Sequence, residues 1–484
     1  MEIHPAKTPR LRTRVMQNTA ALLGGRGISI VLSAGASVLL TRYLGSERLG
    51  QFGALYAYLG LFTWLTTLGI EPVLVREISK ERENASSLLH TAIILASFLC
   101  VGALLATVLI APWAGFNGHL RTLLILAALE FVLIPFRLPG IIFQVDLRQW
   151  YAATINVVRQ GVWFGIVIIL WLLGASLFYV VLGRLLATAV ESALTWAYSR
   201  QFLSVGKKFL RERSGKILLH SMPIAFTTLL SMVYLRIDQV MLHKMASDFV
   251  LGQYVAAVRV SELFEFLPGA LIVSMAPILS VSVDEPLRFQ DYTGKLFRYF
   301  MIGASAICVF MSAGAGLIVR VLYGKQFLPA GPLLAVLIWS EVAVFFATVI
   351  YNVLIAKNQQ WLLPVPTLVG AAVNVALNLV LIPRYGAAGS AWATLVSYTV
   401  AWTGVLFFFR ETRSLIWQGM RFALPITGFA LFSVMCASFV STHDIIRILT
   451  ACIIFGLSLP LSGFIKRSDM TDALAVIRSS LGKS

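Results

Sequence analysis

The sequence predicts an all-α polytopic membrane protein, and three observations support that prediction. Hydrophobic residues make up 58% of the 484 residues, and charged residues make up only 13%. Apolar runs of about 20 to 28 residues follow one another along the chain, and each run is long enough to cross a bilayer as a helix. The connections between the runs are short, with none longer than about 17 residues. This pattern excludes an ordinary soluble globular protein.

About fourteen transmembrane helices are expected, each an apolar run bounded by polar or charged residues. Their ranges are 17–41, 49–70, 88–112, 119–143, 151–173, 176–200, 217–243, 249–276, 295–321, 330–356, 362–383, 386–409, 420–441 and 445–465. With the N-terminus inside, and with residues near span ends counted on the adjacent side, 25 of the 39 Lys and Arg residues lie on the cytoplasmic side, 8 lie outside and 6 lie within spans. This positive-inside bias predicts that both termini are cytoplasmic. It also accounts for the net charge of +17 without a nucleic-acid partner.

The chain contains a weak internal repeat. Leu49-Gly50-Gln51-Phe52 recurs as Leu251-Gly252-Gln253-Tyr254 at an offset of 202 residues, and a second register relates Glu130 to Glu341 at an offset of 211. Both registers correspond to a shift of six helices, which preserves helix orientation. We therefore expect two parallel six-helix lobes around a central cavity, plus two C-terminal helices.

The lobes and their flanking segments divide the chain into six parts. These are a cytoplasmic basic tail at 1–15, an N-lobe at 16–200, a basic cytoplasmic linker at 201–216, a C-lobe at 217–409, the last two spans at 410–465 and a cytoplasmic tail at 466–484.

No motif in the sequence predicts catalysis, a cofactor or a metal. The short connections leave no room for a folded catalytic domain outside the bilayer. The six histidines form no His-x-x-x-His pair or Cys/His cluster, and no phosphate-cradling Gly-x-x-x-x-Gly-Lys segment is present. The four cysteines fall inside apolar runs and are interpreted as core residues. We expect a transporter, not an enzyme.

Arginines inside the expected spans indicate an anionic cargo. Six lipid-facing arginines would cost roughly 15 to 20 kcal/mol, so these side chains must face water, cargo or partners. The planar guanidinium donates two hydrogen bonds to phosphate oxygens while it stays charged, which suits a pyrophosphate. The six are Arg26, Arg137, Arg159, Arg184, Arg236 and Arg259.

Two alternative explanations of these arginines remain open. Arg137 and Arg236 lie only about 10 Å from a span end, so their side chains could reach the interface. Structural ion pairs with acids inside the spans could also neutralise the arginines. The charge balance nevertheless differs between the lobes, with four arginines against two acids in the first six spans and two against four in the next six. The acids are Glu130, Glu191, Asp238, Glu262, Glu265 and Glu341.

Several segments together resemble one family. They are Asn18, Arg42-Tyr43-Leu44-Gly45, Leu49-Gly50-Gln51-Phe52-Gly53, Leu68-Gly69-Ile70, Arg76-Glu77, Arg236-Ile237-Asp238, Leu251-Gly252-Gln253-Tyr254, Glu262, Pro268, Pro277, Asn374-Val375-Ala376-Leu377-Asn378, Leu381-Ile382-Pro383-Arg384-Tyr385-Gly386 and Gly389. Over about residues 15 to 410 the chain resembles the Wzx-type polysaccharide flippases of the multidrug/oligosaccharidyl-lipid/polysaccharide (MOP) exporter superfamily. The resemblance implies a protein of the bacterial inner membrane that exports an undecaprenyl-pyrophosphate-linked oligosaccharide to the outer leaflet by alternating access. Roles in O-antigen, capsule or exopolysaccharide synthesis would follow from that activity.

The expected site residues fall into two groups. Substrate binding is expected at Arg26, Arg159 and Arg184 of the first lobe, which would hold the pyrophosphate or an acidic sugar, and at Arg259 of the second. Coupling to H⁺ or Na⁺ is expected at the acids Glu262, Glu265 and Asp238. For Glu262 and Glu265 the alternative is that they act as latches between the lobes.

Three other functions compete with the glycan flippase. A multidrug exporter of the same superfamily would call for an acidic cavity to hold cationic drugs, against the arginine excess of the first lobe. A lipid II flippase is related in fold, but the opening segments favour the Wzx type. A membrane glycosyltransferase or polymerase would also be hydrophobic, yet such enzymes generally need a sizeable extramembrane loop, which this chain lacks.

Overall fold

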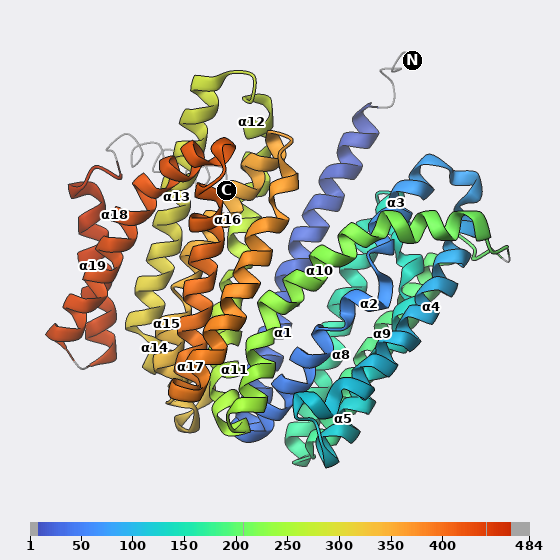
Figure 1. Cartoon of the computed structure of the whole chain (residues 1–484), viewed down its shortest axis with the longest axis horizontal. Coiled ribbons are helices and arrows are strands. Elements are labelled where there is room, and N and C mark those ends of the chain that lie inside the picture. The colour runs from blue at the N-terminus through green and yellow to red at the C-terminus, as the bar shows by residue number, and fades with distance from the viewer. Residues whose placement is uncertain (1–7, 207, 442, 466–484) are drawn as a thin grey trace, which may run out of the picture. The chain divides into compact units, whose positions relative to one another are not determined.

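The computed structural model describes residues 8–206, 208–441 and 443–465, and all regular secondary structure in these ranges is helical (Figure 1). Eleven helical segments of this part of the chain are long and apolar enough to cross a membrane. The predicted all-α polytopic class is thereby confirmed. Residues 1–7 of the expected N-terminal tail and the whole tail at 466–484 lie outside the described residues.

The chain divides into two compact units, at residues 1–255 and 256–484. Unit 1 is built mainly of five long helices and several short ones, which pack around a core formed by α3, α4, α7 and α10. Their bounds are α1 Thr8–Gly60, α2 Thr63–Thr67, α3 Ile70–Lys80, α4 Ala85–Ile110, α5 Gly118–Ala128, α6 Glu130–Leu133, η4 Ile134–Phe136, η5 Leu138–Gly140, α7 Ile141–Val145, α8 Gln149–Leu173, α9 Leu177–Ser199 and α10 Arg211–Met245.

Unit 2 begins within α11 and ends with the two C-terminal helices. Its bounds are α11 Asp248–Ser261, η6 Glu262–Phe264, α12 Phe266–Val281, α13 Pro286–Ala313, α14 Ala315–Tyr323, α15 Ala330–Leu337, α16 Ser340–Ala356, α17 Pro364–Thr399, η9 Val400–Val405, α18 Arg410–Val440 and α19 Asp444–Leu461. The division of the chain into lobes at the linker 201–216 stays a prediction.

Glycines separate expected spans that share one continuous helical element. Gly45 has φ 70° and ψ 178° inside α1, and Gly386 has φ 54° and ψ −131° inside α17. A positive φ is accessible to glycine because it has no Cβ. Gly45 lies between the expected spans 17–41 and 49–70, and Gly386 is the first residue of the expected span 386–409. Two of the eleven membrane-crossing segments, 24–80 and 360–405, therefore each correspond to two expected spans. The expected span at 249–276 is instead divided between α11 and α12 by the 3₁₀ turn η6.

The repeated segments of the sequence cross one another in unit 1. A Cβ added at Gly50 would lie 1.9 Å from the backbone oxygen of Asp248, and one added at Gly252 would lie 1.8 Å from the backbone oxygen of Ser46. Ser46 and Asp248 are separated by the same 202 positions as the two glycines, so the contact is reciprocal. The Ser46 hydroxyl donates to the Phe249 carbonyl at 2.8 Å and lies 3.0 Å from the Gln253 amide nitrogen. The repeat therefore has a direct counterpart in the packing.

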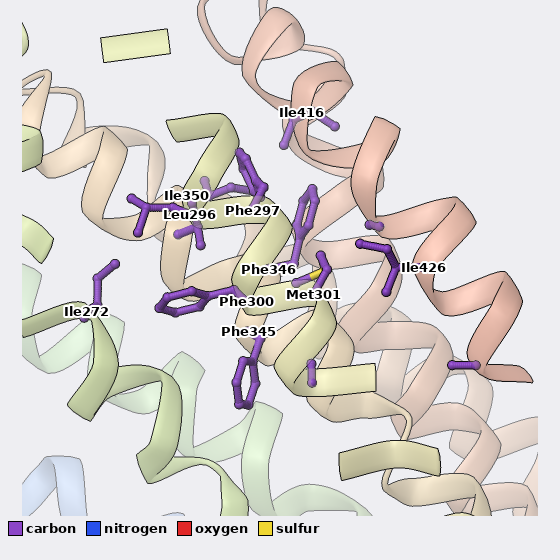
Figure 2. Packing of buried hydrophobic residues seen from close by; sticks show 14 of the residues in the cluster. Ile272, Leu296, Phe297, Phe300, Met301, Phe345, Phe346, Ile350, Ile416 and Ile426 are labelled. Carbon is purple, nitrogen blue, oxygen red and sulfur yellow. The ribbon is translucent and has the colours of Figure 1, made fainter. Parts of the chain in front are cut away.

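The core of unit 2 is formed by α13, α16 and α18, with α19 at its edge. Figure 2 shows Phe297 and Phe346 within this cluster, and their ring centroids lie 5.0 Å apart. Gly419 of α18 lets that helix approach closely, because a Cβ there would lie 2.5 Å from the Phe346 ring. Phe455 of α19 is 4% exposed and belongs to the same core. The last two helices are thus packed into unit 2.

Candidate functional site

Three arginines and two glutamates from four neighbouring segments of unit 1 form a charged cluster. Glu130 begins α6, Arg137 lies between η4 and η5, Arg159 is on α8, and Arg184 and Glu191 are on α9. Arg159 interacts electrostatically with the four other members, so the cluster is a single network. We call these five side chains the charged cluster of unit 1.

Glu191 is shared by two arginines. Its Oε2 atom lies 3.0 Å from Arg137 Nη1 and 3.5 Å from Arg159 Nε. Arg159 also donates from Nη2 to the side-chain oxygen of Asn156 at 3.1 Å, and the Asn156 amide donates to the Ser29 hydroxyl at 3.1 Å. These hydrogen bonds hold Arg159 between α9 and the first half of α1.

Glu130 anchors the other end of the cluster. Its Oε1 atom lies 3.7 Å from Arg184 Nε and accepts a hydrogen bond from the Tyr56 hydroxyl at 2.9 Å. The Arg184 guanidinium carbon lies 4.0 Å from the centre of the Tyr56 ring, within the range of a cation–π contact. Tyr56 therefore orients both members of the pair.

The local sequence explains how these charges meet. Arg184 and Glu191 are seven residues apart on α9, about two helical turns, so one helix face presents both. Pro135 and Pro139 interrupt the preceding segment, which becomes the 3₁₀ turns η4 and η5 instead of one straight helix. Proline removes a backbone donor and clashes with the preceding turn. The resulting bends place Arg137 beside Glu191.

The charged cluster carries a net positive charge. Three guanidinium groups face two carboxylates, which leaves one positive charge when all five are ionised. The side chains of Arg137, Arg159 and Arg184 are 38%, 27% and 38% exposed. Each guanidinium has five N–H donors, more than one shared carboxylate can accept. The cluster can therefore pair internally and still offer donors to an anion.

The remaining predicted substrate-binding residues lie in different parts of the chain. Arg26 is exposed on α1 and lies three residues before Ser29, so the two share a helix face near Asn156. Arg259 lies near the end of α11 in unit 2 and is half-buried. The structure thus brings Arg159 and Arg184 into one cluster and places Arg259 in the other unit.

The predicted coupling acids also differ in environment. Asp238 on α10 is 5% exposed and accepts hydrogen bonds from the Tyr254 hydroxyl and from the backbone N–H of Gln239. Glu262 is half-buried in η6, and Glu265 is exposed just after it. The role of all three in ion coupling stays a prediction.

Sequence reasoning missed part of this site. Arg137 was expected as an intramembrane arginine that could reach the interface, and the structure pairs it with Glu191. Glu130 and Glu191 were expected only as acids that could neutralise arginines, which each does in part. Tyr56 and Asn156 carry no sequence signal of their own, because only folding brings them to the cluster.

Comparisons with known proteins identify the family. The model of the family described as "Polysaccharide biosynthesis protein" matches residues 15–282, more than half of the chain. The chain belongs to this family. The resemblance to Wzx-type flippases is thereby confirmed.

Two proteins of the archaeon Haloferax volcanii are similar to this family member. A "Probable low-salt glycan biosynthesis flippase Agl15" is 23% identical over 385 residues, which cover 77% of this chain and 79% of that protein. A "Probable flippase AglR" is 31% identical over 180 residues, which cover 35% of this chain and 36% of that protein.

Solved structures show the fold of this family member. Lipid II flippase MurJ in an inward closed conformation has a TM-score of 0.72 and 14% identity, and the match covers 91% of this chain and 98% of MurJ. An inward-facing multidrug resistance MATE family transporter of the MOP superfamily has a TM-score of 0.62 and 17% identity, and the match covers 83% of this chain and 98% of that structure. At this level of identity the likeness establishes a multi-pass MOP fold.

Proposed function

We propose that this protein is a flippase that moves a polyprenyl-pyrophosphate-linked oligosaccharide, undecaprenyl-linked in bacteria, from the cytoplasmic to the outer leaflet by alternating access. Arg159 and Arg184, with Arg26 nearby on α1 and Arg259 in unit 2, bind the pyrophosphate or an acidic sugar. No covalent chemistry and no cofactor are needed, because the lipid-linked glycan is moved intact.

The charged cluster of unit 1 is the observation that carries this proposal. Three arginines share two carboxylates, and their side chains are 27% to 38% exposed. A diphosphate has enough oxygen atoms to accept hydrogen bonds from the guanidinium N–H groups that the two carboxylates do not occupy. The names of Agl15 and AglR support the same substrate class, since both are called flippases and Agl15 is assigned to glycan biosynthesis.

The proposal includes an architecture and an orientation. Fourteen spans would form two six-helix lobes around a central cavity with two helices added, in a cell membrane with both termini cytoplasmic. The internal repeat and the reciprocal contact of Gly50 with Gly252 support the two-lobe arrangement. The flipping would be coupled to H⁺ or Na⁺ through Glu262, Glu265 and Asp238. For a bacterial chain the membrane is the inner membrane.

A flipping assay in proteoliposomes tests the proposal. Purified protein is reconstituted with a polyprenyl-pyrophosphate oligosaccharide, and its transfer between leaflets is followed by the accessibility of the glycan to an added enzyme. Hydrogen bonds to charged groups contribute about 1.5 to 3 kcal/mol, so Arg159→Gln is expected to slow transfer about 10- to 100-fold. The matched control is Arg288→Gln, because Arg288 is an exposed arginine that pairs with Glu285 in unit 2.

Several outcomes would contradict the proposal. The proposal is contradicted if the wild-type protein transfers the lipid-linked oligosaccharide no faster than empty liposomes do. It is also contradicted if the Arg159→Gln and Arg26→Ala variants transfer it at the wild-type rate. The same vesicles loaded with lipid II or with a cationic dye distinguish the other candidate activities. Preferential transport of the dye would indicate a multidrug exporter. Preferential transport of lipid II would indicate a lipid II flippase.

A further inference from the structure

Glu341 is the most deeply buried acid in the described part of unit 2. It lies in the first turn of α16, and the residue is 1% exposed. The Ser261 hydroxyl donates to its Oε1 atom at 3.4 Å. Its Oε2 atom is buried and has no hydrogen-bond partner among the described residues. An ionised carboxylate in such a place would lack most of the partners that a buried charge requires.

The start of α16 does not supply the missing donors. The preceding helix α15 runs into α16 through Ile338 and Trp339, so the backbone N–H groups there already have acceptors. The Glu341 N–H donates to the Ile338 carbonyl at 3.1 Å, and the Val342 N–H donates to the Trp339 carbonyl at 3.2 Å. A carboxylate at a free helix N-terminus would be stabilised by exposed N–H groups, and Glu341 has no such terminus.

Two carboxylates among the groups that face Glu341 would oppose a negative charge on it. Glu265, which directly follows η6, and Glu262, which begins η6, both interact electrostatically with Glu341. The Cys308 thiol on α13 also interacts with it and donates to the Ile338 carbonyl at 3.1 Å. Arg259 lies in the last turn of α11, just before η6, and it interacts electrostatically with the Tyr323 hydroxyl. Two further carboxylates beside a buried one favour its neutral form.

We propose that Glu341 is a proton-binding site, that it holds a proton in this conformation, and that it releases and rebinds this proton as the coupling ion. Glu262 is half-buried and Glu265 is exposed, and in this proposal the two pass the proton between Glu341 and the surface of unit 2. The 3₁₀ turn η6 interrupts the helix where these acids lie, and such interruptions often mark points of bending. The role in coupling rests on the proposed ion-driven flipping, whereas proton binding itself does not.

Infrared spectroscopy of the full-length protein in lipid nanodiscs tests proton binding without any substrate. A protonated carboxyl has a C=O stretching band distinct from that of a carboxylate, and the band shifts in D₂O. We expect this band in the wild type at neutral pH and its loss in Glu341→Gln. The control Glu285→Gln makes the same substitution at an exposed acid of unit 2 and should leave the band unchanged. Ser261→Ala removes the hydroxyl that contacts Glu341 and should shift the band without abolishing it.

Survival of the band in Glu341→Gln, or its absence from the wild type, would overturn the proposal. If Glu341→Gln does not fold, an unshifted band in Ser261→Ala is the contradicting result. A second experiment imposes a pH gradient on proteoliposomes loaded with lipid-linked glycan. Wild-type flipping should respond to the gradient and Glu341→Gln flipping should not. A response that persists in Glu341→Gln would refute coupling at this residue, whereas an inactive wild type with an intact band would refute only the proposed function.

Discussion

Single carboxylates decide how the arginines of unit 1 are held. Glu191 contacts Arg137 and Arg159 through one oxygen atom, and Glu130 contacts Arg184 while it accepts a hydrogen bond from Tyr56. Each arginine is partly exposed, so its charge is neither fully solvated nor fully neutralised. In the proposed function, this arrangement would keep the guanidinium groups apart and oriented before the diphosphate arrives.

At the residue scale we predict that Glu191→Gln destabilises the protein without ligand and strengthens its binding of a polyprenyl-pyrophosphate lipid. Removing one partner of a buried ion pair costs about 3–5 kcal/mol, and partial exposure reduces this to roughly 1–2 kcal/mol here. The extra positive charge would then attract the diphosphate more strongly. Thermal unfolding with and without the lipid measures both effects.

The control for this prediction is Glu285→Gln, which breaks an exposed pair with Arg288. Exposed pairs contribute little, so its unfolding temperature should stay close to the wild-type value. Equal shifts in the two variants, or weaker lipid binding by Glu191→Gln, would contradict the assignment of Glu191 as a counter-ion.

At the scale of helices, two glycines allow a close approach between α1 and α11 in unit 1. Gly50 of α1 and Gly252 of α11 each face a backbone oxygen of the opposite helix at a distance that leaves no room for a methyl group. Small residues at a membrane helix crossing allow backbones to pack directly. The reciprocal geometry explains why the same Leu-Gly-Gln pattern stands at both positions.

We predict that Gly50→Ala and Gly252→Ala lower stability by similar amounts, about 1–3 kcal/mol each, because the helices must separate to admit the methyl group. The double variant should cost less than the sum, since both changes disrupt one crossing. Gly102→Ala on α4 is the control, because a Cβ there meets nothing within 4 Å. Thermal unfolding provides the comparison, and full additivity would argue against a shared contact.

At the scale of the whole molecule, charge distribution defines the expected orientation in the membrane. The connection between α9 and α10, at residues 200–210, lies in the segment expected to be a basic cytoplasmic linker and includes Lys208, which is exposed. Lys325, also exposed, follows α14 and lies on the side expected to be extracellular. The excess of Lys and Arg on one side of a membrane protein sets its topology during insertion.

We predict that a membrane-impermeant maleimide added to intact cells labels Lys325→Cys and spares Lys208→Cys. The test uses a background in which Cys100, Cys308, Cys436 and Cys452 are replaced. Labelling of Lys208→Cys after the membrane is permeabilised shows that the position is reactive. The reverse pattern would mean that the positive-inside rule assigns the wrong orientation to this chain.

The helical class, the span ends near Gly45 and Gly386 and the family resemblance could all be predicted from the sequence, because each depends on local composition or on short segments of the chain. Apolar runs define helices wherever a bilayer is the solvent, and polar or glycine residues between runs define their ends. Arg159 and Arg184 could be selected for the same reason, since a charge inside an apolar run is costly wherever it lies.

Tertiary structure alone decided which charges meet. The pairing of Glu130 with Tyr56 and Arg184, and of Glu191 with Arg137 and Arg159, joins residues up to 74 positions apart. The burial of Glu341 beside Ser261 spans 80 positions. Periodicity along a chain records which face of each helix avoids lipid, but not the helix that this face meets. Helix packing determines the ion-pair partner of each charged side chain, and it therefore also determines the net charge of each site.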